Sequence, residues 1–120
     1  MFKGIILVFC LMFNLVVMAE VTSSDSYIDF SEVEVGDSDY IEVEIINEGD
    51  FKVRINRIDL NGDFSVFDLN ESCFGYLEAG DSCYIEVEFR PDQVDDFYGQ
   101  VEVYADDGSN LVIELFGEGI

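Results

Sequence analysis

Carboxylates are the side chains with the greatest capacity for chemistry in this sequence. The 120 residues include 27 Asp and Glu and no His. The lack of imidazole excludes Ser-His and Cys-His nucleophile activation and histidine metal ligation. Paired carboxylates remain able to catalyse glycoside hydrolysis or to bind a hard cation such as Ca²⁺.

Two acidic segments in predicted loops are the candidate cation ligands. One contains Asp92, Asp95 and Asp96, and the other contains Asp106, Asp107 and Asn110. Neither has the twelve-residue spacing and terminal Glu of an EF-hand. We therefore interpret these side chains mainly as solvated turn acids. The alternative is an extracellular adhesion or structural domain that is stabilised by weak binding of Ca²⁺ or another cation. A hydrolase that acts on glycans or peptides is a third possible function. No other cofactor is predicted.

Residues 1–19 differ from the rest of the chain. They read MFKGIILVFCLMFNLVVMA, with one Lys and no acid. A basic start, an apolar stretch and small Ala19 predict a helical signal peptide, cleaved before Glu20. An uncleaved anchor is the alternative, although about 16 apolar residues are fewer than the roughly 20 that span a bilayer. The expected location is secreted or periplasmic, without membrane attachment after cleavage.

Signal cleavage would leave two of the three cysteines, Cys73 and Cys83. In an oxidising compartment an even number of cysteines predicts a disulfide. The spacing is not that of a C-x-x-C redox motif, and two ligands cannot complete a zinc site. A structural disulfide is therefore expected.

The net charge limits the partners. It is −22 for the whole chain, and loss of Lys3 would leave 4 of the 5 basic residues against 27 acids, or −23. A polyanion is repelled by nucleic-acid backbones and by anionic lipid. The expected partner is a protein of unknown identity, with no role for nucleic acid.

The sequence after residue 20 has the pattern of strands and turns. One segment alternates apolar and acidic residues: Ile41, Glu42, Val43, Glu44 and Ile45. Similar segments occur at 27–30, 84–89, 101–105 and 111–115, with two further segments at 51–60 and 64–67. A change of face near Asn56 and Arg57 predicts a bulge. About seven short strands separated by turns predict a β-sandwich or barrel.

The sequence 34–44 is nearly repeated at 78–88, each copy being a Gly-Asp turn followed by an alternating strand. The two strands could be partners in one sheet. A shared turn-then-strand pattern could also produce the repeat without any pairing.

A series of short motifs carries a family resemblance. In order they are Asp29-Phe30, Val35-Gly36, Asn47-Glu48-Gly49, Ile58, Gly62-Asp63-Phe64, Cys73, Leu77, Gly80-Asp81-Ser82-Cys83, Phe89-Arg90-Pro91, Gly99-Gln100-Val101 and Leu115-Phe116-Gly117-Glu118-Gly119. The set resembles the immunoglobulin-like domain of the ASPM/Hydin type. That domain occurs in bacterial choice-of-anchor D surface proteins, in ciliary Hydin-like proteins, and after the protease domain of some secreted bacterial serine proteases.

The resemblance implies a seven-stranded immunoglobulin-like β-sandwich, similar to the major sperm protein fold, with no known catalytic centre. We expect a signal peptide at 1–19, a short linker at 20–27 and the domain at 28–120. The implied function is a non-catalytic interaction or accessory module that binds protein through a sheet edge or face. Aromatic residues that could form the interaction surface are Tyr40, Tyr84, Phe97, Tyr98 and Tyr104.

Overall fold

The computed structural model describes residues 20–63, 65–73 and 75–120. The predicted signal peptide therefore lies outside the described residues. The strands are β1 (Val21–Ser23), β2 (Tyr27–Val33), β3 (Asp39–Asn47), β4 (Val53–Gly62), β5 (Phe67–Glu71), β6 (Gly75–Leu77), β7 (Ser82–Phe89), β8 (Asp95–Ala105) and β9 (Asn110–Gly119). No helix in these ranges is long and apolar enough to cross a membrane.

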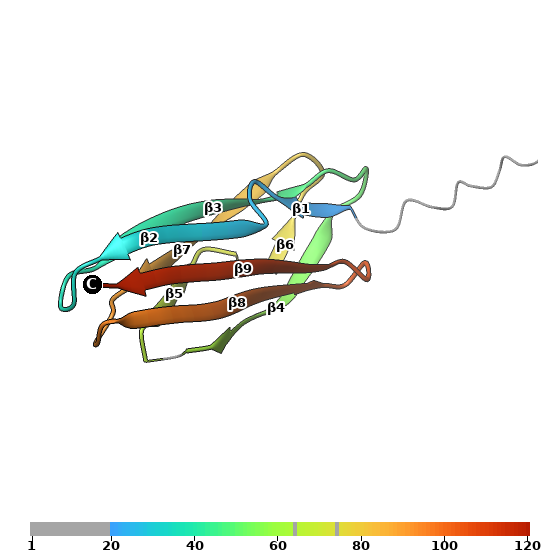
Figure 1. Ribbon diagram of the computed structural model, residues 1–120. Coiled ribbons are helices and arrows are strands. Elements are labelled where there is room, and N and C mark those ends of the chain that lie inside the picture. The colour runs from blue at the N-terminus through green and yellow to red at the C-terminus, as the bar shows by residue number, and fades with distance from the viewer. Residues whose placement is uncertain (1–19, 64, 74) are drawn as a thin grey trace, which may run out of the picture.

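The strands form two sheets that pack against each other (Figure 1). One has four strands in the order β1-β3-β7-β5, and the other has five in the order β2-β9-β8-β4-β6. All pairings are antiparallel except that of β2 with β9. The predicted all-β immunoglobulin-like sandwich is confirmed.

The described residues contain nine strands where about seven were predicted, and the N-terminal segment explains part of the difference. The interval 20–27 was predicted as a linker, which is wrong, because β1 pairs there with residues 45–47 of β3. Val21 is buried. The chain then crosses to the other sheet and continues as β2, so one N-terminal segment contributes a strand to each sheet.

The two copies of the internal repeat are neighbours. β3 pairs with β7 over eight residue pairs from Asp39↔Phe89 to Ile46↔Ser82. The inward residues Val43, Ile85 and Val87 have no solvent exposure, as expected for alternating strands on a buried core. The predicted partnership is confirmed. The predicted bulge is also confirmed, because the β4–β8 register shifts between Ile55 and Arg57.

Aromatic rings fill one part of the core. Phe89 is fully buried, and its ring centroid lies 5.5 Å from Phe30, 5.1 Å from Phe67 and 5.9 Å from Phe97. Gly117 of β9 faces this cluster. A Cβ built on Gly117 would lie 2.7 Å from two atoms of the Phe89 ring, so only glycine leaves room for the ring.

Buried Asn47 connects the two sheets at one end. Its Nδ2 donates to the carbonyl oxygens of Phe51 and Leu77, each at 2.9 Å, and its Oδ1 accepts from the Gly49 N–H at 3.0 Å. These bonds satisfy the amide, as burial of a polar group requires. They fix the β3–β4 turn against β6 of the opposite sheet.

Candidate functional site

Cys73 and Cys83 form the predicted disulfide, with a Cα–Cα distance of 5.2 Å. Cys83 lies in β7, whereas Cys73 lies where the chain passes from β5 to β6. Since β5 and β6 belong to different sheets, the bond fixes this crossover to the four-stranded sheet. Both residues are buried, which is consistent with a structural role.

The two acidic segments lie at opposite ends of the sandwich (Figure 1). Asp92, Asp95 and Asp96 are at the start of β8, whereas Asp106 and Asp107 follow its end, with Asn110 opening β9. An eleven-residue strand separates them by about 33 Å. They cannot form a single cation site.

Several of these carboxylates accept hydrogen bonds from backbone N–H groups. Asp106 Oδ1 accepts from the Arg54 N–H at 3.0 Å, and Asp107 Oδ1 accepts from the Ser109 N–H at 2.8 Å. Asp95 Oδ1 accepts from the Asp96 N–H at 2.8 Å. Among the described residues no group of three or more Asp, Glu, Cys or His is arranged to hold a metal ion.

The five aromatic residues do not form one surface. Phe97 is only 7% exposed and packs on Phe89, so its prediction as a surface residue is wrong. Tyr40 and Tyr84 lie on the four-stranded sheet, and Tyr98 and Tyr104 lie on the five-stranded sheet. The two pairs thus belong to opposite outer faces.

The outer face of the four-stranded sheet is acidic. We define this acidic face by its outward carboxylates, which are Glu42, Glu44, Asp68, Glu86 and Glu88. Glu42 is directly opposite Glu86, and Asp68 is opposite Glu88. In the described part of the chain, the one ion pair on this face joins Arg90 Nη2 to Glu88 Oε2 at 3.2 Å. Negative charge is therefore largely uncompensated here.

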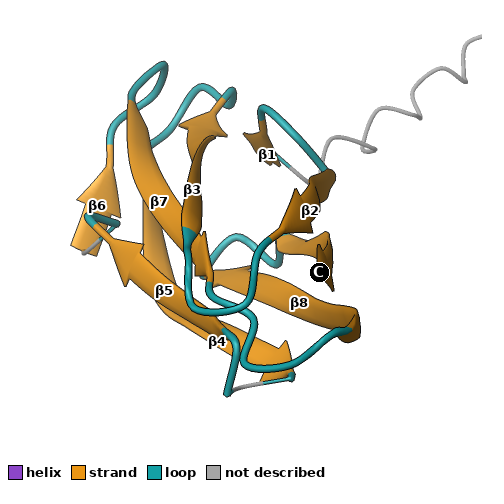
Figure 2. Cartoon of the chain, turned by 60° about the vertical axis from the view of Figure 1, so that its left-hand side comes forward, coloured by secondary structure: helices purple, strands orange, loops and turns teal. Residues whose placement is uncertain are grey.

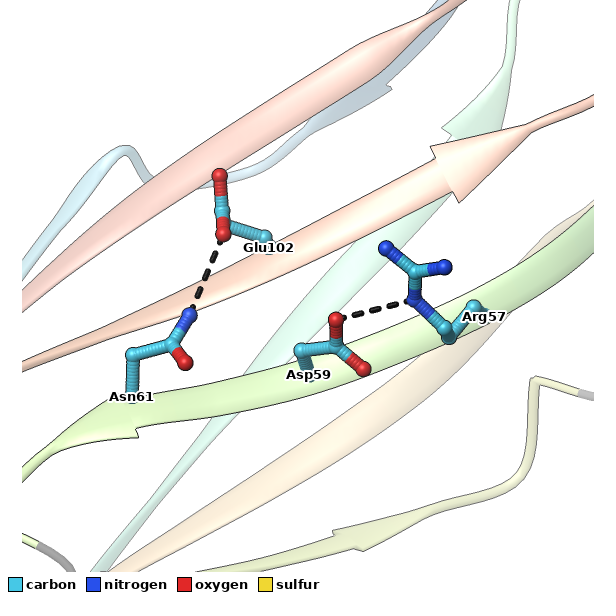
Figure 3. A network of polar contacts seen from close by, with 4 residues as sticks. All are labelled: Arg57, Asp59, Asn61 and Glu102. Carbon is cyan, nitrogen blue, oxygen red and sulfur yellow. Dashed lines mark hydrogen bonds and ion pairs between the residues drawn. The ribbon is translucent and has the colours of Figure 1, made fainter.

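The opposite face contains a polar network between β4 and β8 (Figure 3). Arg57 Nε donates to Asp59 Oδ2 at 2.9 Å, and Asn61 Nδ2 donates to Glu102 Oε1 at 3.1 Å. The Arg57 guanidinium also lies 4.2 Å from the centroid of the Tyr104 ring, a cation–π contact. The hydrogen bond to Asp59 is the main reason that the Arg57 pKa is raised. Arg57 is thus held on the sheet by an acid and a ring.

Glu71, at the end of β5, is a feature that the sequence pattern did not single out. Its Oε1 is buried and has no hydrogen-bond partner within the described residues. Loss of solvent contact raises its carboxyl pKa, although a backbone hydrogen bond from Cys73 acts in the opposite direction. No sequence signal marks this side chain, because its burial results from packing beside the disulfide crossover.

The family described as HYDIN/CFA65/VesB-like, Ig-like domain matches residues 19–118. This chain belongs to that family. The assignment agrees with the resemblance carried by the motifs between Asp29 and Gly119. A comparison with curated proteins gave no significant match.

Solved structures share the fold of this HYDIN/VesB-like domain. The ASH/PapD-like domain 7 of human CEP192 is 17% identical with a TM-score of 0.67, covering 86% of this chain and 87% of that domain. The VesB protease of Vibrio cholerae is 13% identical with a TM-score of 0.66, covering 82% of this chain and 32% of the protease.

The secreted serine protease VesC of Vibrio cholerae is 17% identical with a TM-score of 0.60, covering 76% of this chain and 21% of the protease. The chain thus spans about a third or less of each protease. Identities this low establish the common fold and nothing more specific.

Proposed function

We propose that this HYDIN/VesB-like domain is an exported, non-catalytic accessory module that binds a protein partner. The family match over residues 19–118 carries the proposal, because the matched unit is an immunoglobulin-like domain that covers almost the whole chain. Within the described residues the carboxylates that could suggest catalysis are divided between the two ends of the sandwich. Binding is therefore assigned to the sheet surfaces and edges.

Export is supported by two independent features. The Cys73–Cys83 disulfide is of a kind that persists in oxidising compartments. The first nineteen residues have the composition of a secretory signal. Similarity to a secreted protease agrees with this location. The proposed site of action is therefore the periplasm or the outside of the cell.

Export can be tested by expressing the full chain with a C-terminal tag in a secreting bacterial host. Mass spectrometry of the exported protein should show Glu20 as the first residue and a mass two hydrogens below that of the reduced protein. Replacing Ala19 with Arg removes the small residue at the cleavage site, and it should leave the signal attached. Retention of the intact chain in the cytoplasm, with free thiols, would contradict export.

The interaction function needs a separate test. The tagged, exported chain would be incubated with the extracellular fraction of its native source, and bound proteins would be identified by mass spectrometry. A chain with residues 20–120 in scrambled order serves as the control for adsorption to a polyanion, since it has the same charge but lacks the alternating pattern that forms the strands. We expect a protein retained by the folded domain alone. Retention of the same proteins by both samples would count against specific binding.

A further inference from the structure

The edge of β3 is only partly covered. β1 pairs with residues 45–47 of β3 and then leaves the four-stranded sheet. Figure 2 shows β1 beside the C-terminal end of β3 only. On that side, the segment from Asp39 to Val43 has no paired strand among the described residues. This part of β3 is thus an unpaired edge of the sheet.

Backbone hydrogen bonds of β3 show which of its groups face the open side. The Asn47 N–H donates to the Asp81 carbonyl at 2.9 Å, toward β7. The Ser24 N–H donates to the Glu44 carbonyl at 2.8 Å, on the β1 side. Because the bonding direction alternates along a strand, odd-numbered β3 residues bond toward β7. The backbone groups of Tyr40 and Glu42 therefore point away from it.

Most of the other groups on this edge already have partners. The Tyr40 N–H donates to Asp39 Oδ1 at 2.9 Å, and the Glu44 N–H donates to Ser24 Oγ at 3.0 Å. Glu42 is exposed. Within the described ranges, no protein group forms a hydrogen bond with its backbone N–H or C=O. A residue with both groups available is what a paired antiparallel strand requires.

The opposite edge of the same sheet is less suitable. On β5 the Phe67 N–H donates to the Asp63 carbonyl at 3.3 Å, and the Leu69 N–H donates to Asp68 Oδ1 at 2.9 Å. These contacts occupy the outward donors of Phe67 and Leu69 and leave only that of Glu71, at the end of β5, for an additional strand. The edge of β3 at Glu42 is therefore the favoured position for strand addition.

Side chains beside this edge specify the chemistry of the added strand. Its outward residues would lie next to Glu42 and Glu44 on the acidic face, and its inward residues would lie next to Ile41 and Val43. Opposite charges across a strand pair are favourable and like charges are unfavourable. A second copy would bring two acidic faces together at a net charge of −22 each, so self-pairing is disfavoured.

We propose that the unpaired edge of β3 at Tyr40–Val43 binds an extended segment of a partner protein, in which Lys or Arg alternates with apolar residues, as an added strand. This inference rests on the proposed interaction function and names the class of its partner. Backbone hydrogen bonds at Glu42 supply the pairing, and the acidic face selects the basic side chains.

A peptide pair tests the proposal. The probe is a short synthetic peptide of alternating Lys and Val, and its control is the same peptide methylated at the backbone nitrogen of every Lys, the residue type that would lie opposite Glu42. Both carry the same charge, but the control cannot form the strand ladder. We expect the control to bind on the order of tenfold more weakly by fluorescence anisotropy, through loss of one or two hydrogen bonds. Equal affinity of the two peptides would overturn strand addition.

Hydrogen exchange locates the binding. The Glu42 amide should exchange fast in the free protein and slow down with the Lys-Val peptide, whereas the Leu69 amide on β5 should not change. The Glu42→Lys variant should weaken binding, and Glu78→Lys, which makes the same charge change in the β6–β7 turn, should retain it. Unchanged exchange at Glu42 would refute the edge assignment. If native partners are still captured in that case, the interaction function stands and only this site is wrong.

Discussion

Glu42 of β3 lies directly opposite Glu86 of β7 in the antiparallel register. Odd-numbered β3 residues bond toward β7, so this is a non-hydrogen-bonded pair, in which the Cα atoms approach to about 4.5 Å. Asp68 and Glu88 form a second acidic pair between β5 and β7. The two copies of the internal repeat thus place like charges together on one face.

Reversing one charge of the first pair should stabilise the domain. Glu86→Lys replaces a repulsive cross-strand contact with an attractive one, and we expect a gain of about 0.2–1 kcal/mol in unfolding free energy. Urea denaturation measures this difference. Glu78→Lys changes the net charge equally at a turn position and is the control. An equal gain in both variants would show that net charge, not the Glu42–Glu86 pair, limits stability.

Salt should also stabilise the protein. The screening length falls from about 10 Å at 0.1 M to about 3 Å at 1 M ionic strength, which weakens repulsion on the acidic face. We therefore expect a clear rise in Tm between about 0.1 and 1 M NaCl. Calcium chloride at equal ionic strength should raise Tm no further. A larger rise with calcium would support the hypothesis of a specific cation site.

Removal of the disulfide should lower stability without changing the fold. Cys73 and Cys83 are separated by ten residues, and a loop of this size corresponds to about 2–3 kcal/mol on the chain-entropy estimate. A Cys73→Ser, Cys83→Ser variant should lose this amount in urea denaturation. Reductant should destabilise the native protein and have no effect on the variant. A variant as stable as the oxidised protein would contradict the structural role.

Glu71 should make stability depend on pH. Its pKa in the folded protein is raised above the ordinary value of 4.5. Between the ordinary pKa and the native pKa, the native state therefore binds more protons than the unfolded state. Stability is therefore greatest below the ordinary pKa and decreases as pH rises through the native pKa. Glu71→Gln removes the buried charge. We expect a higher Tm than the native protein at pH 7 and little difference below about pH 4; equal Tm values at neutral pH would argue against a desolvated carboxylate.

Gly117 should not tolerate a side chain. An added Cβ would contact the Phe89 ring at 2.7 Å, and overpacking of this kind costs about 1–3 kcal/mol. Gly117→Ala should therefore lower Tm by several degrees, since 1 kcal/mol corresponds to about 4–8 °C in a domain of this size. Gly117→Ala should lower Tm less when it is introduced into a Phe89→Leu variant than when it is introduced into the native protein. Additive effects of the two substitutions would show that they do not share this contact.

The alternation of apolar and acidic residues by itself predicted several of the strands, β3 and β7 among them, and the faces that they bury. Val43, Ile85 and Val87 are buried as expected, because side chains on a strand alternate with a period of two. The cysteine spacing and the export signal pattern likewise predicted the Cys73–Cys83 bond. These features depend on residues that are close in the chain or on simple counting.

Apart from the pairing of β3 with β7, tertiary structure alone decided which strands are neighbours and which edges remain open. Packing between distant residues divides the N-terminal segment into β1 and β2 and buries Phe97. It also buries Glu71 Oε1 without a hydrogen-bond partner among the described residues. The same holds for the acidic segments, which look alike in sequence but lie at opposite ends of β8. An alternating pattern sets the face of a side chain but not the strand beside it, so the open edge at Glu42 became visible only once β1 was seen to stop short of it.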